Sequence, residues 1–235
     1  FVQLESKPGN SAKAMKAERK AFKDATSSAG ISYKQRRNFE KVWNGLSIDT
    51  SANNANKIKS LPGIKGVWPV VKFDMPVLDA AASPDLISAI KMTGADIAQN
   101  SLGYKGKGVK VAIMDTGVDI DSKDFGGDGV ARYDSPLFPS ERVAYGYDFV
   151  GDAYDARFAE TSTPMPDANP DDCQGHGTHV AGIVGAKGPT IKGVAPEVTL
   201  GAYRVFGCNG STDADIMMAA MEMALEDGMD VLNMS

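Results

Sequence analysis

The sequence predicts an α/β protein in which a mostly parallel sheet with helices on both faces is preceded by a small ferredoxin-like α/β module. Two observations carry this prediction. Residues 1–73 follow the order strand, helix, two strands, helix and strand, which is the order of a ferredoxin-like unit. From residue 109 onward, apolar runs of strand length alternate with helical patterns, which is typical of parallel strands covered by helices.

The elements of the first module follow from local patterns. Residues 2–5 form a short apolar strand, and residues 11–28 carry apolar side chains at near-helical spacing among charges. Gly30 is expected to close that helix. Residues 31–50 hold two extended stretches that are separated at the turn dipeptide Asn44-Gly45. The remaining elements expected here are a helix at residues 51–60 and a strand at residues 67–73.

The second module is separated from the first by residues 74–84, which are small, proline-punctuated and aperiodic and therefore predict a linker. A helix is expected to begin at Pro84-Asp85. Residues 109–114 (VKVAIM) are an apolar run of the kind that is buried in a parallel sheet. The other elements expected are strands at residues 143–149, 198–205 and 230–234 and helices at residues 176–185 and 213–227.

The composition is that of an ordinary globular protein, with 235 residues of which 43% are hydrophobic and 23% charged. The net charge of -5 argues against nucleic acid or an anionic membrane surface as a partner, because both favour a basic face. No apolar run approaches the roughly 20 residues that span a bilayer. The chain opens with Phe1, so we expect any targeting peptide to have been removed.

Asp115-Thr116-Gly117 directly follows the apolar run at residues 109–114. Open α/β sheets place functional groups at the carboxyl ends of parallel strands, so Asp115 is a candidate functional carboxylate. Taken alone, the tripeptide is better explained as a turn. It also marks the aspartic proteases, which share a proton between two such carboxylates. Because the sequence has no second motif of this kind, that alternative requires a homodimer.

Both histidines of the sequence lie within residues 175–182 (GHGTHVAG), at the expected start of a helix. The small residues in this segment allow another backbone to approach closely. Metal binding is one alternative, but a His-x-x-His pair supplies no third ligand. A pair of structural histidines is the other alternative. We accept a structural role for His179 and favour a chemical role for His176.

Four segments resemble successive blocks of the subtilisin family of serine proteases, in the order of that family. They are residues 111–119 (VAIMDTGVD), 176–182 (HGTHVAG), 193–196 (GVAP) and 230–235 (DVLNMS). The resemblance covers about residues 84–235. It implies an incomplete subtilisin-like sheet and peptide-bond hydrolysis by a triad that occurs in the order Asp, His, Ser.

The resemblance makes Asp115 and His176 the first two members of the triad. His176 is expected to take the proton of the serine hydroxyl, while Asp115 accepts a hydrogen bond from the other ring nitrogen. The nucleophile and oxyanion-hole asparagine of the family lie downstream of the block that ends at Ser235, so this segment alone is expected to be inactive. Ser235 itself resembles a position that lines the specificity pocket and binds substrate through its backbone.

The resemblance also interprets two loops. Gly210, Ser211 and Thr212 resemble the edge segment that pairs with an extended substrate strand, although an ordinary surface loop is the alternative. Cys173 and Cys208 fall in loops that face each other across one side of the cleft in the family. A disulfide between them is therefore implied, with two unpaired thiols as the alternative.

No metal ligand or cofactor is expected in this segment. Asp124 resembles a position that contributes to a calcium site in many family members. The companion loop at residues 187–192 is short and lacks the usual Asn and Asp ligands. Asp124 is therefore expected to be a solvated or capping carboxylate, and the acidic stretch at residues 167–172 a solvated loop. Calcium elsewhere in the full-length protein stays open.

The first module resembles the inhibitory prodomain of subtilisin-type proenzymes, through residues 2–4, 44–47 and 61–67. The likeness implies that it assists folding and packs on surface helices of the protease. Its tail, residues 68–78, would lie in the active-site cleft until autoprocessing cuts it. A merely structural N-terminal domain is the alternative. The domains predicted are a prodomain at residues 1–76, a linker with the processing region at 77–84, and the N-terminal part of the catalytic domain at 85–235.

The sequence is thus interpreted as part of a secreted, monomeric serine endopeptidase proenzyme that acts on polypeptides. The alternative, from a different class, is a non-catalytic truncated protein that inhibits or binds subtilisin-like proteases. Because a parallel sheet without its remaining strands exposes apolar edges, the isolated segment is expected not to fold stably.

Overall fold

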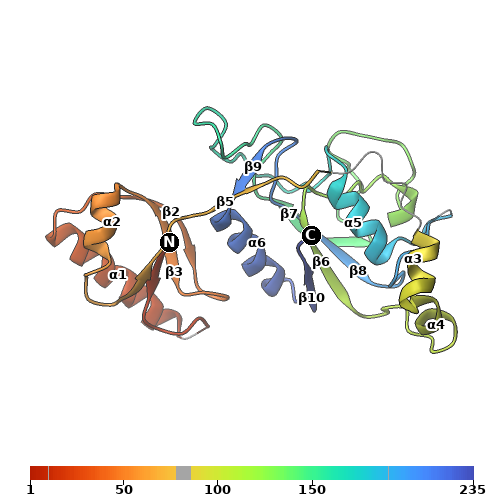
Figure 1. Ribbon diagram of the computed structural model, residues 1–235, viewed down its shortest axis with the longest axis horizontal. Coiled ribbons are helices and arrows are strands. Elements are labelled where there is room, and N and C mark those ends of the chain that lie inside the picture. The colour runs from red at the N-terminus through yellow and green to blue at the C-terminus, as the bar shows by residue number, and fades with distance from the viewer. Residues whose placement is uncertain (10, 78–85, 190) are drawn as a thin grey trace. The chain divides into compact units, whose positions relative to one another are not determined.

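The computed structural model describes residues 1–9, 11–77, 86–189 and 191–235, in two compact units (Figure 1). Residues 78–85 contain most of the predicted linker and the predicted helix start at Pro84-Asp85, and they lie outside the described residues. The first unit comprises Phe1–Val71 and Asp213–Met223, and the second comprises Lys72–Thr212 and Ala224–Ser235.

The first unit contains an antiparallel four-stranded sheet of order β2-β3-β1-β4. The helices α1 and α2 each begin where a serine hydroxyl, Ser11 or Ser51, accepts the backbone N–H three residues further on. This order of elements agrees with the predicted ferredoxin-like pattern. The elements are β1 (Val2–Leu4), α1 (Ala12–Ser28), β2 (Lys34–Phe39), β3 (Gly45–Asp49), α2 (Ala52–Ile58) and β4 (Ile64–Val67).

The core of this unit lies between the sheet and its helices. Inward-facing side chains of β1 and β3 meet the apolar faces of α1 and α2, as the period of the helical pattern requires. The buried members are Val2, Leu4, Phe22, Ile31, Leu46 and Ile58.

The prediction of one strand at residues 67–73 is wrong. The structure has two strands in this stretch, because β4 ends at Val67 and β5 (Lys72–Asp74) begins five residues later. Pro69 lies in the interruption and has no N–H to donate to a sheet. Trp68 still bonds to Phe1 in both directions, since its N–H donates to the carbonyl of Phe1 at 3.0 Å and its carbonyl accepts the N-terminal amino group of Phe1 at 2.6 Å.

The second unit is built on a four-stranded sheet of order β10-β6-β8-β7, in which every pairing is parallel. This confirms the predicted α/β fold with a mostly parallel sheet. Helix α5 (His176–Gly185) packs against the two central strands, and its Val180 and Ala181 join their core. The strands are β6 (Lys110–Asp115), β7 (Val143–Asp148), β8 (Thr199–Arg204) and β10 (Val231–Asn233).

The remaining elements are short, apart from the last helix. None of the described helices combines the length and the apolarity that crossing a membrane requires. β5 and β9 form a separate two-stranded sheet, drawn in orange and blue in Figure 1. The elements are α3 (Leu86–Thr93), α4 (Ala95–Asn100), the 3-10 turn η1 (Lys123–Phe125), β9 (Ser211–Asp213) and α6 (Ala214–Glu226).

Candidate active site

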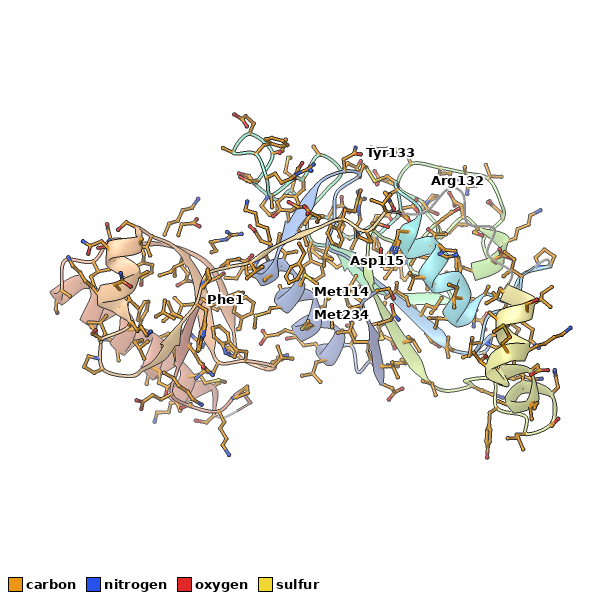
Figure 2. All side chains as sticks on the ribbon, in the orientation of Figure 1. Phe1, Met114, Asp115, Arg132, Tyr133 and Met234 are labelled. Atoms are coloured by element: carbon orange, nitrogen blue, oxygen red, sulfur yellow. A yellow bond between two sulfur atoms is a disulfide. The ribbon has the colours of Figure 1, made fainter. Side chains whose placement is uncertain are left out.

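Asp115, which is labelled in Figure 2, is the last residue of β6. Its side chain is only 1% exposed. The strand that carries it is paired at both edges, with β10 and β8, and its Val111 and Ile113 pack in the core cluster that includes Val180 and Ala181 of α5. Its Oδ1 accepts the N–H of Thr116 at 2.8 Å. The predicted placement at the carboxyl end of a parallel strand is therefore correct, and the carboxylate points into the protein interior.

His176 is the first residue of α5, directly after Gly175, whose φ of 105° lies in the left-handed region. Its Nδ1 lies 2.8 Å from Oδ1 and 3.0 Å from Oδ2 of Asp115. The side chain of His176 is 14% exposed, whereas that of Asp115 is 1% exposed. The structure thus brings together two residues that are 61 positions apart in the sequence.

Gly177 allows this close approach between the start of α5 and the turn after β6. A Cβ at this position would lie 2.1 Å from the carbonyl oxygen of Gly117 and 3.1 Å from the Cβ of Asp115. The N–H of Gly177 bonds to the hydroxyl oxygen of Thr116 at 2.9 Å. Any larger side chain would therefore push the histidine away from its carboxylate.

Burial raises the pKa of Asp115 above the ordinary value of 3.8, and the hydrogen bonds from His176 and Thr116 oppose that rise. A carboxylate in this position holds the imidazole in the tautomer that carries its proton on Nδ1. The second nitrogen, Nε2, is then free to accept a proton. The arrangement suits a general base oriented by a third group, as in enzymes that activate a nucleophile.

Cys173 and Cys208 form a disulfide with an S–S distance of 2.07 Å and a Cα–Cα distance of 5.3 Å. Cys173 lies three residues before His176, and Cys208 lies two residues before Gly210. The disulfide therefore connects the loop that leads into α5 with the loop that leads into β9.

Arg204 lies against this disulfide and was not singled out from the sequence. The side chain is 3% exposed, and its Nη2 is 3.0 Å from the sulfur of Cys173. It also pairs with Asp148 at 3.2 Å and with Asp152 at 2.7 Å. The sequence does place this arginine near the end of an apolar strand, and a charged side chain in such a buried position needs buried partners.

Ser211 and Thr212 are buried residues of β9 rather than parts of an ordinary surface loop, and Gly210 directly precedes this strand. On one side, the N–H of Ala156 bonds to the carbonyl of Ser211 at 3.0 Å. On the other side, β9 pairs with β5, and the N–H of Met75 bonds to the carbonyl of Gly210 at 3.0 Å.

Ser235 follows β10 and is exposed. Its hydroxyl donates a hydrogen bond to Oδ1 of Asn233 at 2.8 Å. The residues brought together around the imidazole are Asp115 and His176, whereas Ser235 belongs to the end of the neighbouring strand.

The acidic candidates for a metal site make other contacts. Asp124 lies in η1, where its carbonyl accepts the N–H of Lys187 at 2.9 Å. Within the part of the chain that the structure describes, one group of three side chains has ligand atoms close enough for a metal. That group is Asp152 with Cys173 and Cys208, and the disulfide occupies both of its sulfurs. Asp124 is therefore not placed to share a cation with two further ligands of these types in the described ranges.

The expectation that residues 167–172 form a solvated loop is wrong for their last two carboxylates. Asp171 accepts the N–H of Ser135 at 3.1 Å, and Asp172 accepts hydrogen bonds from Thr116 and Thr178. Both side chains are partly buried by these contacts. The sequence pattern suggested solvation because it could not reveal donors that arrive from distant segments.

The second unit is a parallel α/β unit in which a buried carboxylate contacts an imidazole at the start of a helix. This arrangement suits the class of enzymes in which an oriented general base activates a nucleophile. Comparison with known families identifies the family within this class. Residues 106–235 match the model described as the subtilase family. The chain belongs to this family.

Three relatives illustrate the similarity. The minor extracellular protease Vpr of Bacillus subtilis (strain 168) is 38% identical over 229 residues, which cover 94% of this chain and 25% of the relative. The PII-type proteinase of Lacticaseibacillus paracasei is 33% identical over 210 residues, which cover 83% of this chain and 10% of the relative. Subtilisin DY of Bacillus licheniformis is 35% identical over 136 residues, covering 57% of this chain and 38% of the relative. The chain thus spans only a minor part of the length of these relatives.

Proposed function

We propose that this chain comprises the prodomain and the first part of the catalytic domain of a subtilisin-like serine endopeptidase made as a proenzyme. Its triad would consist of Asp115, His176 and a serine downstream of Ser235. The observation that carries the proposal is the contact of 2.8 Å between Nδ1 of His176 and the buried carboxylate of Asp115. Membership of the subtilase family supports the same assignment.

The chemistry follows from this contact. Nε2 of His176 takes the hydroxyl proton of the serine as its oxygen attacks the peptide carbonyl, and later returns a proton to the leaving amine. The imidazolium that forms between these steps is stabilised by the carboxylate of Asp115. Because the serine and the oxyanion-hole asparagine are assigned to positions downstream of Ser235, residues 1–235 alone are proposed to be inactive.

Gly210, Ser211 and Thr212 are proposed to bind the substrate as an added strand, with Ser235 contributing backbone contacts to the specificity pocket. The pairing of β9 with β5 supports this proposal, because an extended segment already uses that edge. Recognition through backbone groups accepts many polypeptide sequences.

The segment that uses the edge is the tail of the proposed prodomain, residues 1–76. Met75 donates its N–H to Gly210, and the carbonyl of Pro76 lies 3.4 Å from Nε2 of Gln174, two residues before His176. A chain that enters the site as a strand blocks the entry of other substrates. We therefore propose that this tail inhibits the enzyme until it is cut in the region of residues 77–84.

Contacts inside the first unit suggest how the prodomain would stay bound after cleavage. Arg36 pairs with Asp213 at 2.6 Å and with Asp215 at 2.9 Å. Oε1 of Glu222 accepts the N–H groups of residues 40–42 at 2.6 to 3.2 Å. A cut in the linker would leave all of these contacts in place, so the cleaved prodomain is expected to dissociate slowly.

We further propose that the protein acts outside the cell, as a monomer, without a nucleic-acid or membrane partner and without a cofactor. The disulfide supports an oxidising compartment, since such bonds persist in secreted proteins and are rare in the cytosol. The relative Vpr is named a minor extracellular protease, which agrees with this proposal.

The two histidines provide a matched test in the full-length protein. His176→Ala is expected to abolish hydrolysis of a denatured protein substrate and to leave the precursor uncut. His179→Ala changes the same residue type three positions along the same helix, at an exposed site, and should retain both activities. Gel electrophoresis follows release of a fragment of the size expected for residues 1–76.

Equal activity of the two histidine variants would overturn the assignment of His176. A full-length wild-type protein that hydrolyses no peptide but inhibits added subtilisins would instead favour the non-catalytic alternative.

A further inference from the structure

The start of α5 is held entirely from outside the helix. The first N–H groups of a helix have no partner within it, and Gly175 at the N-cap offers no side chain to bond them. The N–H of His176 bonds to Oε1 of Gln174 at 2.8 Å, and that of Gly177 bonds to the hydroxyl of Thr116 at 2.9 Å. The position of His176 therefore depends on what supports these neighbours.

Asp172 supports them. Its Oδ1 accepts the hydroxyl of Thr116 at 3.0 Å and the N–H groups of Gln174 and Gly175, both at 2.9 Å. Its Oδ2 accepts both the N–H of Thr178 at 3.0 Å and the hydroxyl of Thr178 at 2.5 Å. One carboxylate thus receives five hydrogen bonds.

These donors come from both sides of the Asp115–His176 pair. Thr116 follows Asp115, and the other three residues flank His176 on either side. The hydroxyl of Thr178 also accepts the N–H of Asp119 at 2.9 Å, which is a second link to the turn after β6. Among the described carboxylates, that of Asp172 is the one that bonds to the side chains of both Thr116 and Thr178.

The network needs an acceptor that never donates. Burial favours the neutral form of Asp172, but hydrogen bonds from Thr178, Gly175 and Gln174 outweigh it and lower the pKa of this carboxyl below 3.8. An ionised carboxylate can accept on both oxygens, whereas an amide of the same shape must present a donor in place of one of them.

We propose that Asp172 is a positioning residue for the Asp115–His176 pair, whose carboxylate fixes the start of α5 against the turn that carries Asp115. The effect of Asp172 on turnover rests on the proposed function, because Asp172 acts only through His176. Its role in holding the start of α5 against the turn after β6 does not depend on the proposed function.

The test compares Asp172→Asn with Asp171→Asn in the full-length protein. The two variants remove the same charge from adjacent residues of one loop. Asp171 is the matched control, since its carboxylate accepts the N–H groups of Ser135 and Asp172 and not those around His176. We expect Asp172→Asn to lower kcat on the order of 10²-fold with KM within about threefold, because misplacing a catalytic group costs turnover rather than binding. Asp171→Asn should stay within about threefold in both constants.

The second readout needs no activity. Exchange of the imidazole C2 hydrogen, followed by mass spectrometry, reports on His176 and His179 separately. In Asp172→Asn the exchange rate of His176 should change by about twofold or more, as expected for an imidazole that loses its charge partner. His179 on the same helix should be unchanged, as should both histidines in Asp171→Asn.

A hydroxyl series separates positioning from a general loss of stability. Thr178→Val removes the hydroxyl donor to Oδ2 of Asp172 but keeps the N–H donor, so it should reproduce part of the loss in kcat. Thr178→Ser retains the hydroxyl and should keep kcat near the wild-type value. The proposal is overturned if Asp172→Asn leaves the exchange rate of His176 unchanged, or if His176 and His179 change together. An inactive wild-type protein would reject the proposed function alone, because the exchange measurement still decides the role of Asp172.

Discussion

The hydroxyl of Thr116 accepts the N–H of Gly177 at 2.9 Å, so the residue after Asp115 is bonded to the residue after His176. The two side chains of the candidate site are thus joined twice, once through their own contact and once through their sequence neighbours. This double connection makes the geometry sensitive to changes beside the pair as well as within it. The predictions below refer to the full-length protein.

Asp115→Asn is expected to raise the melting temperature at neutral pH while lowering turnover by about 10⁴-fold. Burial raises the pKa of Asp115 in the folded state above 3.8, so the folded protein binds this proton more tightly than the unfolded chain does. The stability that the protonated carboxyl of Asp115 contributes is therefore fully present below the pKa of this group in the unfolded chain. It is lost as the pH rises through the pKa of the group in the folded protein. Thermal unfolding should show an advantage of Asp115→Asn that grows with pH over this range.

Asp128→Asn is the control of opposite sign. Arg132 and the N–H of Val130 lower the pKa of Asp128 to about 2. Its contribution is present above the unfolded pKa and is lost as the pH falls toward about 2. This variant should be slightly less stable than the wild type at neutral pH and equal to it in strong acid. If the difference in stability from the wild type changed with pH in the same direction for both variants, the opposite pKa shifts of Asp115 and Asp128 would be contradicted.

Gly177→Ala is expected to destabilise the protein by about 1–3 kcal/mol and to reduce activity, because its Cβ would overlap the carbonyl oxygen of Gly117. Gly182→Ala on the same helix is the matched control, since a Cβ there meets nothing within 4 Å. That variant should gain up to about 1 kcal/mol from the higher helix propensity of alanine. Denaturant unfolding and peptide hydrolysis measure both effects, and equal losses in the two variants would refute the steric argument.

Replacing Cys173 and Cys208 together by serine is expected to cost about 4 kcal/mol, the chain-entropy estimate for a disulfide with a sequence separation of 35. The free energy of unfolding should be compared with and without a reducing agent. Reduction should weaken the wild type as much as the double substitution does, and it should leave the double variant unchanged. A wild type that is insensitive to reduction would show that the disulfide contributes little to stability.

Arg204→Met is expected to cost about 3–5 kcal/mol, because it leaves the carboxylate of Asp148, which is 1% exposed, without its buried partner. Arg157→Met is the control, since the side chain of Arg157 is 49% exposed where it pairs with Asp155, against 3% for Arg204. Exposed ion pairs contribute little, so the control should unfold at nearly the wild-type denaturant concentration. Adding Asp148→Asn to Arg204→Met should recover part of the loss.

Local patterns were sufficient for much of the fold and for the central pair of the site. The apolar run before Asp115 predicted a buried strand, and the small residues around His176 predicted a helix start with close neighbours. The resemblance to the subtilisin family then implied both the pairing of these residues and the disulfide. In each case the signal lay within a few consecutive residues.

Other features lay beyond any local pattern. The break between β4 and β5 was missed because apolar residues on both sides of Pro69 resemble one continuous strand. Arg204 and Asp172 were missed because a charged residue in sequence gives no sign of which distant groups will surround it. Asp172, for instance, receives a hydrogen bond from Thr116, 56 positions away.

Local patterns in the sequence were enough to predict the buried strand before Asp115, the helix that begins at His176 and the chemical types at the ends of both elements. The strand order β10-β6-β8-β7, the support of α5 by Asp172 and the burial of Arg204 against the disulfide became evident only in the folded chain. Periodicity reports which face of an element is buried and not what buries it. Hydrogen bonds and ion pairs between distant segments form only once the parallel sheet has brought the ends of its strands together.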